Sequence, residues 1–145
     1  MLGVFSRQHW GPGPGPVDQE GMTDMFSVEL TIRHVNGFAV VALSGELDLV
    51  DTPAVASQLI ATVAESGSII VDLTDLAYIS CGGLGVLVRV LNLTRVRDRA
   101  LLLVAPQGMV RVILQATGLV DVFSVYPTVQ QALNTAALAR PLVSS

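Results

Sequence analysis

The first regular feature along the chain is an alternation of apolar and polar side chains in residues 26–34. This two-residue period predicts a half-buried β-strand. Asn36 and Gly37 follow, and this pair is typical of a two-residue hairpin turn. Residues 38–43 are almost continuously apolar, which predicts a returning strand with a more central place in the sheet. The alternating apolar positions of the first strand are Val28, Leu30 and Ile32.

Residues 44–48 form a short polar segment that is expected to follow the second strand. After it, apolar residues recur at helical spacing. Thr52 is expected to cap the helix, and Pro53 suits its first position because no N–H group is needed there. The apolar spacing continues to about Glu65, and Gly67 is placed to end the helix. The positions expected to be buried are Val55, Leu59, Ile60 and Val63.

The central stretch of the chain is predicted to be a strand, a small-residue turn and a helix. Residues 69–73 are a β-branched, apolar run typical of a strand buried on both faces. Residues 74–79 lead to a turn at 80–83, and two apolar stripes predict a helix from Leu84 to about Arg97, covered on two sides. Its polar strip is interpreted as a solvated face, with a docking strip for an acidic partner as the alternative. That strip comprises Arg89, Asn92, Arg95 and Arg99.

The remaining pattern predicts a strand at 100–105, a helix at 107–117, a short strand within 120–126 and a last helix at 129–138. A capping box is expected at the start of the last helix, formed by Thr128 and Gln131. The order of elements predicts a single α/β domain. We expect a mixed β-sheet opened by a β-hairpin, with about four helices packed mainly on one side.

Composition agrees with one well-filled domain, because 51% of the 145 residues are hydrophobic and 14% are charged. The expected organisation is a flexible Gly/Pro-rich tail at 1–25, a domain at 26–140 and a short tail at 141–145. Within the first tail, Trp10 with His9 is an alternative docking motif, and Met22 or Met25 is an alternative start.

Charge and cysteine content narrow the class of protein. A net charge of −4 and a pI near 4.9 argue against nucleic acid as a partner. No apolar run reaches the roughly 18 residues of a membrane span, and the N-terminus lacks a secretory signal layout. A single cysteine excludes an intramolecular disulfide and is consistent with the reducing interior of a cell. We therefore expect a cytoplasmic protein.

Two segments resemble a known family. They are VVALSGELDL at 40–49 and VDLTDLAYISCGGLGVL at 71–87. They are similar to STAS domains, and in particular to bacterial anti-sigma factor antagonists, over about residues 26–139. The resemblance implies binding to an anti-sigma factor with a kinase-like ATPase fold, which releases a sigma factor and regulates transcription. In that family the turn usually reads Asp-Ser-Ser-Gly-Leu, and its first serine is phosphorylated by the anti-sigma factor.

In this chain Cys81 stands at the phosphoacceptor position and Ser80 replaces the aspartate. A thiol is no substrate for ordinary serine kinases. We therefore expect either that the protein is permanently competent to bind its partner or that its binding is controlled by means other than phosphorylation. Ser80 is an alternative phosphosite, or it hydrogen-bonds within the turn. Cys81 is interpreted as a small, partly buried residue that fits the turn, with oxidant sensing as the alternative. The expected partner-binding residues are Glu46, Asp48, Ser80, Cys81, Gly82, Gly83, Leu84 and Arg89.

No enzyme chemistry is predicted, and no cofactor or metal. Neither histidine belongs to a metal-spaced cluster, and residues 82–85 lack the spacing of a dinucleotide-binding loop. Glu46 and Asp48 are interpreted as partner-recognition carboxylates in preference to a catalytic pair. Two alternatives to the anti-sigma role stay open. One is a scaffold or accessory subunit of a transporter or stress-signalling complex, and the other is a small-ligand sensor, although no basic pocket is evident in the sequence.

Overall fold

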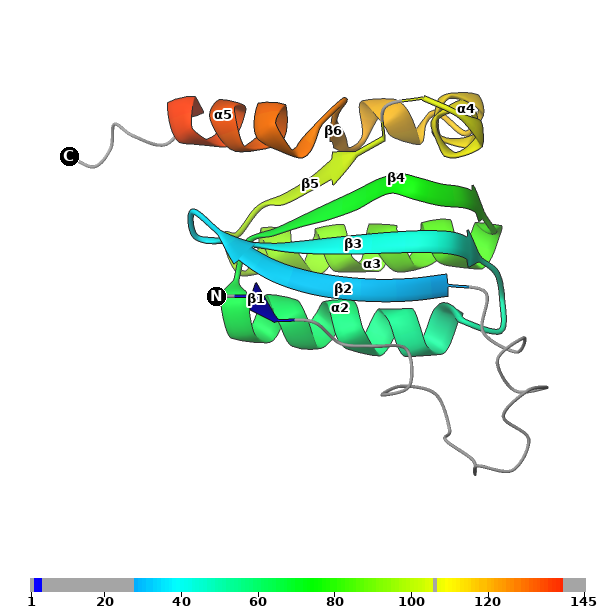
Figure 1. Cartoon of the computed structure of the whole chain (residues 1–145), viewed down its shortest axis with the longest axis horizontal. Helices are drawn as coiled ribbons and strands as arrows, with labels where there is room; N and C mark the ends of the chain where they lie inside the picture. The colour runs from blue at the N-terminus through cyan, green and yellow to red at the C-terminus, as the bar shows by residue number, and fades with distance from the viewer. Residues whose placement is uncertain (1, 4–27, 106, 140–145) are drawn as a thin grey trace.

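Six strands form one mixed sheet in the order β1-β2-β3-β4-β5-β6 (Figure 1). The computed structural model describes residues 2–3, 28–105 and 107–139. β2 pairs antiparallel with both β1 and β3, whereas β3, β4, β5 and β6 run parallel. The strands are β1 (Leu2–Gly3), β2 (Val28–Val35), β3 (Phe38–Leu47), β4 (Ile69–Ile79), β5 (Leu101–Val104) and β6 (Ser124–Tyr126).

Helices cover both faces of this sheet, and Figure 1 shows α2 and α5 on opposite sides of it. The helices are α2 (Thr52–Ser66), α3 (Cys81–Val96), α4 (Met109–Ala116) and α5 (Val129–Ala139), with a 3₁₀ turn, η3, at Leu119–Asp121. α2, α3 and α4 contribute to the larger core, whereas α5 packs over a smaller one. The predicted fold class, a mixed sheet with helices mainly on one side, is confirmed.

The opening hairpin follows its sequence pattern. Val28, Leu30 and Ile32 are buried, and the residues between them are exposed. Asn36 and Gly37 both have positive φ angles, 50° and 86°, which the right-handed twist of the flanking strands favours in a two-residue turn. The predicted hairpin is therefore confirmed.

β3 and β4 extend further than their apolar runs predict. We expected β3 to end near residue 43 and β4 near residue 73, but they reach Leu47 and Ile79. Parallel pairing continues to Leu47 opposite Ile79, with two register shifts after Ala42. Several side chains in these strand ends face solvent, which explains why their sequence is polar. Backbone hydrogen bonds nevertheless continue the β-structure there. The two strands consequently end side by side.

Several helix boundaries differ from those predicted. Asp51 is the N-cap residue of α2 in place of Thr52, whose hydroxyl instead donates to the Asp48 carbonyl oxygen at 3.0 Å. The expected buried positions of α2 are buried except Ile60, which is half-buried. α3 begins at Cys81, three residues before the predicted Leu84, because Ser80 caps it.

The C-terminal elements lie close to their predicted positions. α4 begins at Met109 and not at residue 107, and the predicted short strand within 120–126 is present as β6, preceded by a 3₁₀ turn. The expected cap of α5 is present, since the Gln131 N–H donates to Thr128 Oγ1 at 3.0 Å.

Leu2–Gly3, within the predicted N-terminal tail, pairs with β2 as a short strand. The rest of that tail lies outside the described residues, as do the Trp10–His9 motif and the C-terminal tail.

Candidate functional site

The ends of β3 and β4 bring two loops together at one end of the sheet. The Ser80 N–H donates to the Leu47 carbonyl oxygen at 2.9 Å, which ties the start of α3 to the end of β3. A Cβ atom placed on Gly82 would lie 3.0 Å from Leu49 Cδ2. The β3–α2 loop therefore lies against the first turn of α3. We call this surface the β3–α3 corner, formed by Glu46, Asp48, Leu49, Val50, Tyr78, Cys81 and Gly82.

Ser80 is buried next to this corner and caps α3. It is 6% exposed, and its Oγ accepts a hydrogen bond from the Gly83 N–H at 3.1 Å. This bond satisfies one of the backbone donors that have no partner within the helix. The expected hydrogen bond within the turn is thus confirmed. A phosphoryl group on this oxygen would have to displace the cap and enter a buried space.

Cys81 lies on the opposite side of the turn and is exposed. The expectation that it is partly buried is wrong. β4 ends with Ile79 buried, and the chain then turns Ser80 inward as the N-cap, so the first helical residue faces solvent. An exposed side chain at the amino end of a helix, beside backbone N–H groups, is accessible to another protein.

Gly83 and Leu84, both expected to bind a partner, lie in the protein interior. A Cβ atom on Gly83 would lie 2.8 Å from Ile79 Cγ1 and 3.0 Å from two atoms of Leu47. Leu84 is 6% exposed and belongs to the larger core. These two residues hold α3 close to the strand ends and do not form the outer surface.

The predicted recognition carboxylates lie at the surface. Glu46 is exposed near the end of β3, and its register partner is Tyr78 of β4. Asp48 is exposed in the loop, and its Oδ1 accepts from the Leu49 N–H at 2.8 Å. Arg89 is exposed further along α3, as are Asn92 and Arg95. Arg99, also predicted for this polar strip, is exposed but lies beyond the end of the helix.

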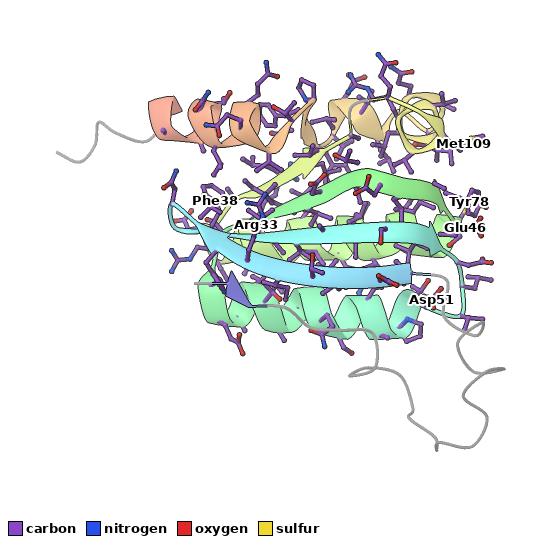
Figure 2. All side chains as sticks on the ribbon, in the orientation of Figure 1. Arg33, Phe38, Glu46, Asp51, Tyr78 and Met109 are labelled. Carbon is purple, nitrogen blue, oxygen red and sulfur yellow. The ribbon has the colours of Figure 1, made fainter. Side chains whose placement is uncertain are left out.

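The apolar side chains of the corner were not among the residues predicted to bind a partner. Leu49 is 67% exposed, Val50 66% and Tyr78 42%. Figure 2 shows Tyr78, Glu46 and Met109 at the same end of the molecule, and Met109 is also an exposed apolar side chain. Clustered apolar side chains with polar neighbours are typical of protein-binding surfaces. The available signal was an apolar pair between Asp48 and Asp51, inside a loop.

Other kinds of site receive no support from the described part of the chain. Within it, no three His, Cys, Asp or Glu side chains gather in a way that could hold a metal ion. Among the helices described, none combines the length and apolar character needed to cross a membrane.

Comparisons with known proteins identify a family and similar solved structures. The STAS domain family matches residues 29–132. An anti-sigma factor antagonist from Mycobacterium paratuberculosis is 27% identical, with a TM-score of 0.66 over 75% of this chain and 93% of that chain. A putative anti-sigma factor antagonist from Thermotoga maritima is 23% identical, with a TM-score of 0.65 over 73% and 92% of the two chains.

A transporter shares the fold at lower identity. Murine Solute Carrier 26 family member A9, an anion transporter, is 16% identical, with a TM-score of 0.63. The match covers 73% of this chain but 18% of the transporter, so the likeness shows the fold alone. The family match, in contrast, spans well over half of this chain and includes both β3 and the turn at residues 80–83. The chain therefore belongs to the STAS domain family, and its structural neighbours include anti-sigma factor antagonists.

Proposed function

We propose that this protein is an anti-sigma factor antagonist that binds a kinase-type anti-sigma factor through the β3–α3 corner and so releases a sigma factor. The observation that carries the proposal is the exposure of Leu49 and Val50 beside Cys81, at the amino end of α3. The family match and the antagonist neighbours support the same role.

The chemistry of the corner suits a protein partner. Leu49, Val50 and Tyr78 supply apolar area that is removed from water on binding, which is the main favourable term in association. Glu46 and Asp48 lie at its edge as exposed carboxylates and would meet cationic side chains of the partner. A partner surface with an apolar centre and basic margin fits both features.

Because Cys81 carries a thiol, the phosphoacceptor position lacks the hydroxyl group that a serine kinase phosphorylates. The remaining hydroxyl in the turn, on Ser80, is buried and caps α3. The native protein is therefore proposed to stay competent for binding without phosphorylation control, and to act as a binding protein with no catalytic step of its own.

Leu49→Glu is expected to weaken binding to the anti-sigma factor by about thirtyfold or more, the loss typical of an interface hot spot. The charge would occupy an apolar contact, yet Leu49 is exposed in the free protein, so folding should be preserved. The matched control is Val96→Glu, since Val96 is 84% exposed at the far end of α3, roughly 22 Å along the helix axis at 1.5 Å per residue.

Binding of the protein to purified kinase-type anti-sigma factors from the source organism is measured by calorimetric titration. Release of the sigma factor from its complex with the anti-sigma factor is monitored by size-exclusion chromatography. Native chain and Val96→Glu should bind and release sigma, whereas Leu49→Glu should not. Equal loss in both variants would contradict the corner as the binding surface. Binding to a transporter's membrane domain, with no binding to any of these anti-sigma factors, would favour the scaffold role.

A further inference from the structure

A hollow of about 420 Å³ lies at the opposite end of the strands from the β3–α3 corner. It opens beneath α5, beside the β2–β3 hairpin and the starts of β4 and β5. α5 presents Ala132, Leu133 and Ala136 toward this face of the sheet, and Ala136 lines the hollow. The lining residues are Gly37, Phe38, Ser66, Ser68, Arg99, Ala100, Leu102, Tyr126, Thr135 and Ala136.

Most of this lining is apolar. Phe38 and Leu102 belong to the smaller core, and each keeps 8% of its surface exposed. Tyr126 and Ala136 pack against the same core and are half-buried. The volume and the predominance of carbon atoms are those of a site for a small organic molecule. A ligand that fills the hollow would therefore need an apolar body.

Arg99 is the one charged residue among those that line the hollow, and the other polar side chains carry hydroxyl groups, which can both donate and accept. Ser68 Oγ accepts from the Ala100 N–H at 3.2 Å, which leaves the serine O–H available to donate. Arg99 adds a guanidinium with several N–H donors, and the lining includes no aspartate or glutamate. Glu65 lines an adjoining hollow that also contains Arg97 and shares Arg99 and Ser66. The ligand atoms that meet these donors must be acceptors.

Arg99 is held near the mouth of the hollow by the local backbone. Gly67 has a φ of +89°, and a Cβ atom at this position would lie 3.0 Å from Arg99 Nε. The side chain therefore packs across the connection between α2 and β4. Among the described residues, no carboxylate forms an ion pair with its guanidinium, and its backbone N–H donates to the Thr94 carbonyl oxygen at 2.7 Å.

We propose that this hollow binds a small amphipathic carboxylate. Its alkyl chain or ring would contact Phe38, Leu102 and Ala136, and its carboxylate would accept hydrogen bonds from Arg99 and Ser68. One planar guanidinium matches a single carboxylate, whereas a phosphate ester with about two charges would call for further cations. The proposal does not depend on the anti-sigma role, because the hollow and the corner lie at opposite ends of the strands.

The full chain, labelled with ¹⁵N, is titrated with sodium octanoate and, in parallel, with neutral octanamide, and amide chemical shifts are recorded. Octanoate should cause saturable shifts around residues 66–68, 99–102 and 135–136, with a dissociation constant of about a millimolar for so small a ligand. Arg99→Gln should weaken octanoate binding about tenfold, the loss of one charge-assisted contact. Arg95→Gln is the matched control, because Arg95 is exposed on α3 and lines neither hollow.

Arg99 has a competing structural explanation, since α2 and α3 both end nearby and cations stabilise helix C-termini. If that were its whole role, Arg99→Gln would lower the melting temperature while octanoate and octanamide shifted the same amides equally. That result would overturn the proposal. So would absent or non-saturating shifts, shifts centred on residues 48–50 and 81–83, or equal affinities in Arg99→Gln and Arg95→Gln.

Discussion

A chain carrying Cys81→Ser is expected to accept phosphate from the cognate anti-sigma factor and ATP, whereas the native chain is not. Position 81 is exposed at the amino end of α3, so a serine hydroxyl there would be open to a kinase. The new phosphate would gain from the backbone N–H groups and the positive end of the helix dipole. Intact-protein mass spectrometry after incubation with ATP measures the transfer.

The same variant should lose affinity for the anti-sigma factor once it is phosphorylated. Close to two negative charges would be added beside Asp48 and Glu46, on a surface that must come out of water on binding. Calorimetry with the phosphorylated and unphosphorylated forms measures this loss. Unchanged affinity would argue against the corner as the interface.

Ser80→Ala distinguishes phosphorylation at position 80 from phosphorylation at position 81. It removes the N-cap bond to Gly83 and should lower the free energy of unfolding by about 1 kcal/mol. In the Cys81→Ser background it should leave phosphate transfer in place. Robust phosphorylation of the native chain that disappears in Ser80→Ala would contradict the assignment of Ser80 as a structural cap.

Gly83→Ala is expected to be less stable than Gly85→Ala. Both replace a glycine within α3, which by helix propensity alone gains about 1 kcal/mol. The new methyl group at position 83 would lie 2.8 Å from Ile79 and 3.0 Å from Leu47, both fully buried. At position 85 nothing lies within 4 Å.

Overpacking typically costs about 1–3 kcal/mol, so Gly83→Ala should be less stable than Gly85→Ala by that amount. Urea denaturation followed by circular dichroism measures both free energies of unfolding, and the shared propensity term cancels in their difference. Equal stabilisation of the two variants would show that α3 is not held tightly against the strand ends.

The fold could be predicted because its signals are local. The alternation in β2, the Asn36–Gly37 turn and the continuous apolar runs of β4 and β5 each specify one element. Their order then selects a mixed sheet with crossover helices. The strand ends could not be predicted in this way, because residues 44–47 and 74–79 mix buried apolar positions with exposed polar ones and are continued as strands by backbone pairing.

The candidate site could be predicted only in part. The resemblance predicts a binding site in the loop after β3 and the turn before α3, and the structure brings these two segments together. Gly83 and Leu84, however, lie in the interior, and Leu49 and Val50 are exposed although neither was among the predicted residues. Whether an apolar loop residue is covered depends on tertiary packing, which periodicity does not report. The hollow beneath α5 was equally hidden, since its lining comes from segments far apart in the chain.

Amide hydrogen exchange on the native chain, free and bound to its anti-sigma factor, tests the docking corner most directly. The N–H groups of Cys81 and Gly82, in the first turn of α3, have no helical carbonyl acceptors, so they should exchange fast in the free protein. Binding is predicted to slow exchange there and in residues 48–51, with the start of β5 and α5 unchanged. Protection confined to α5 or to the end of α3 near Val96, with none at the corner, would contradict the account.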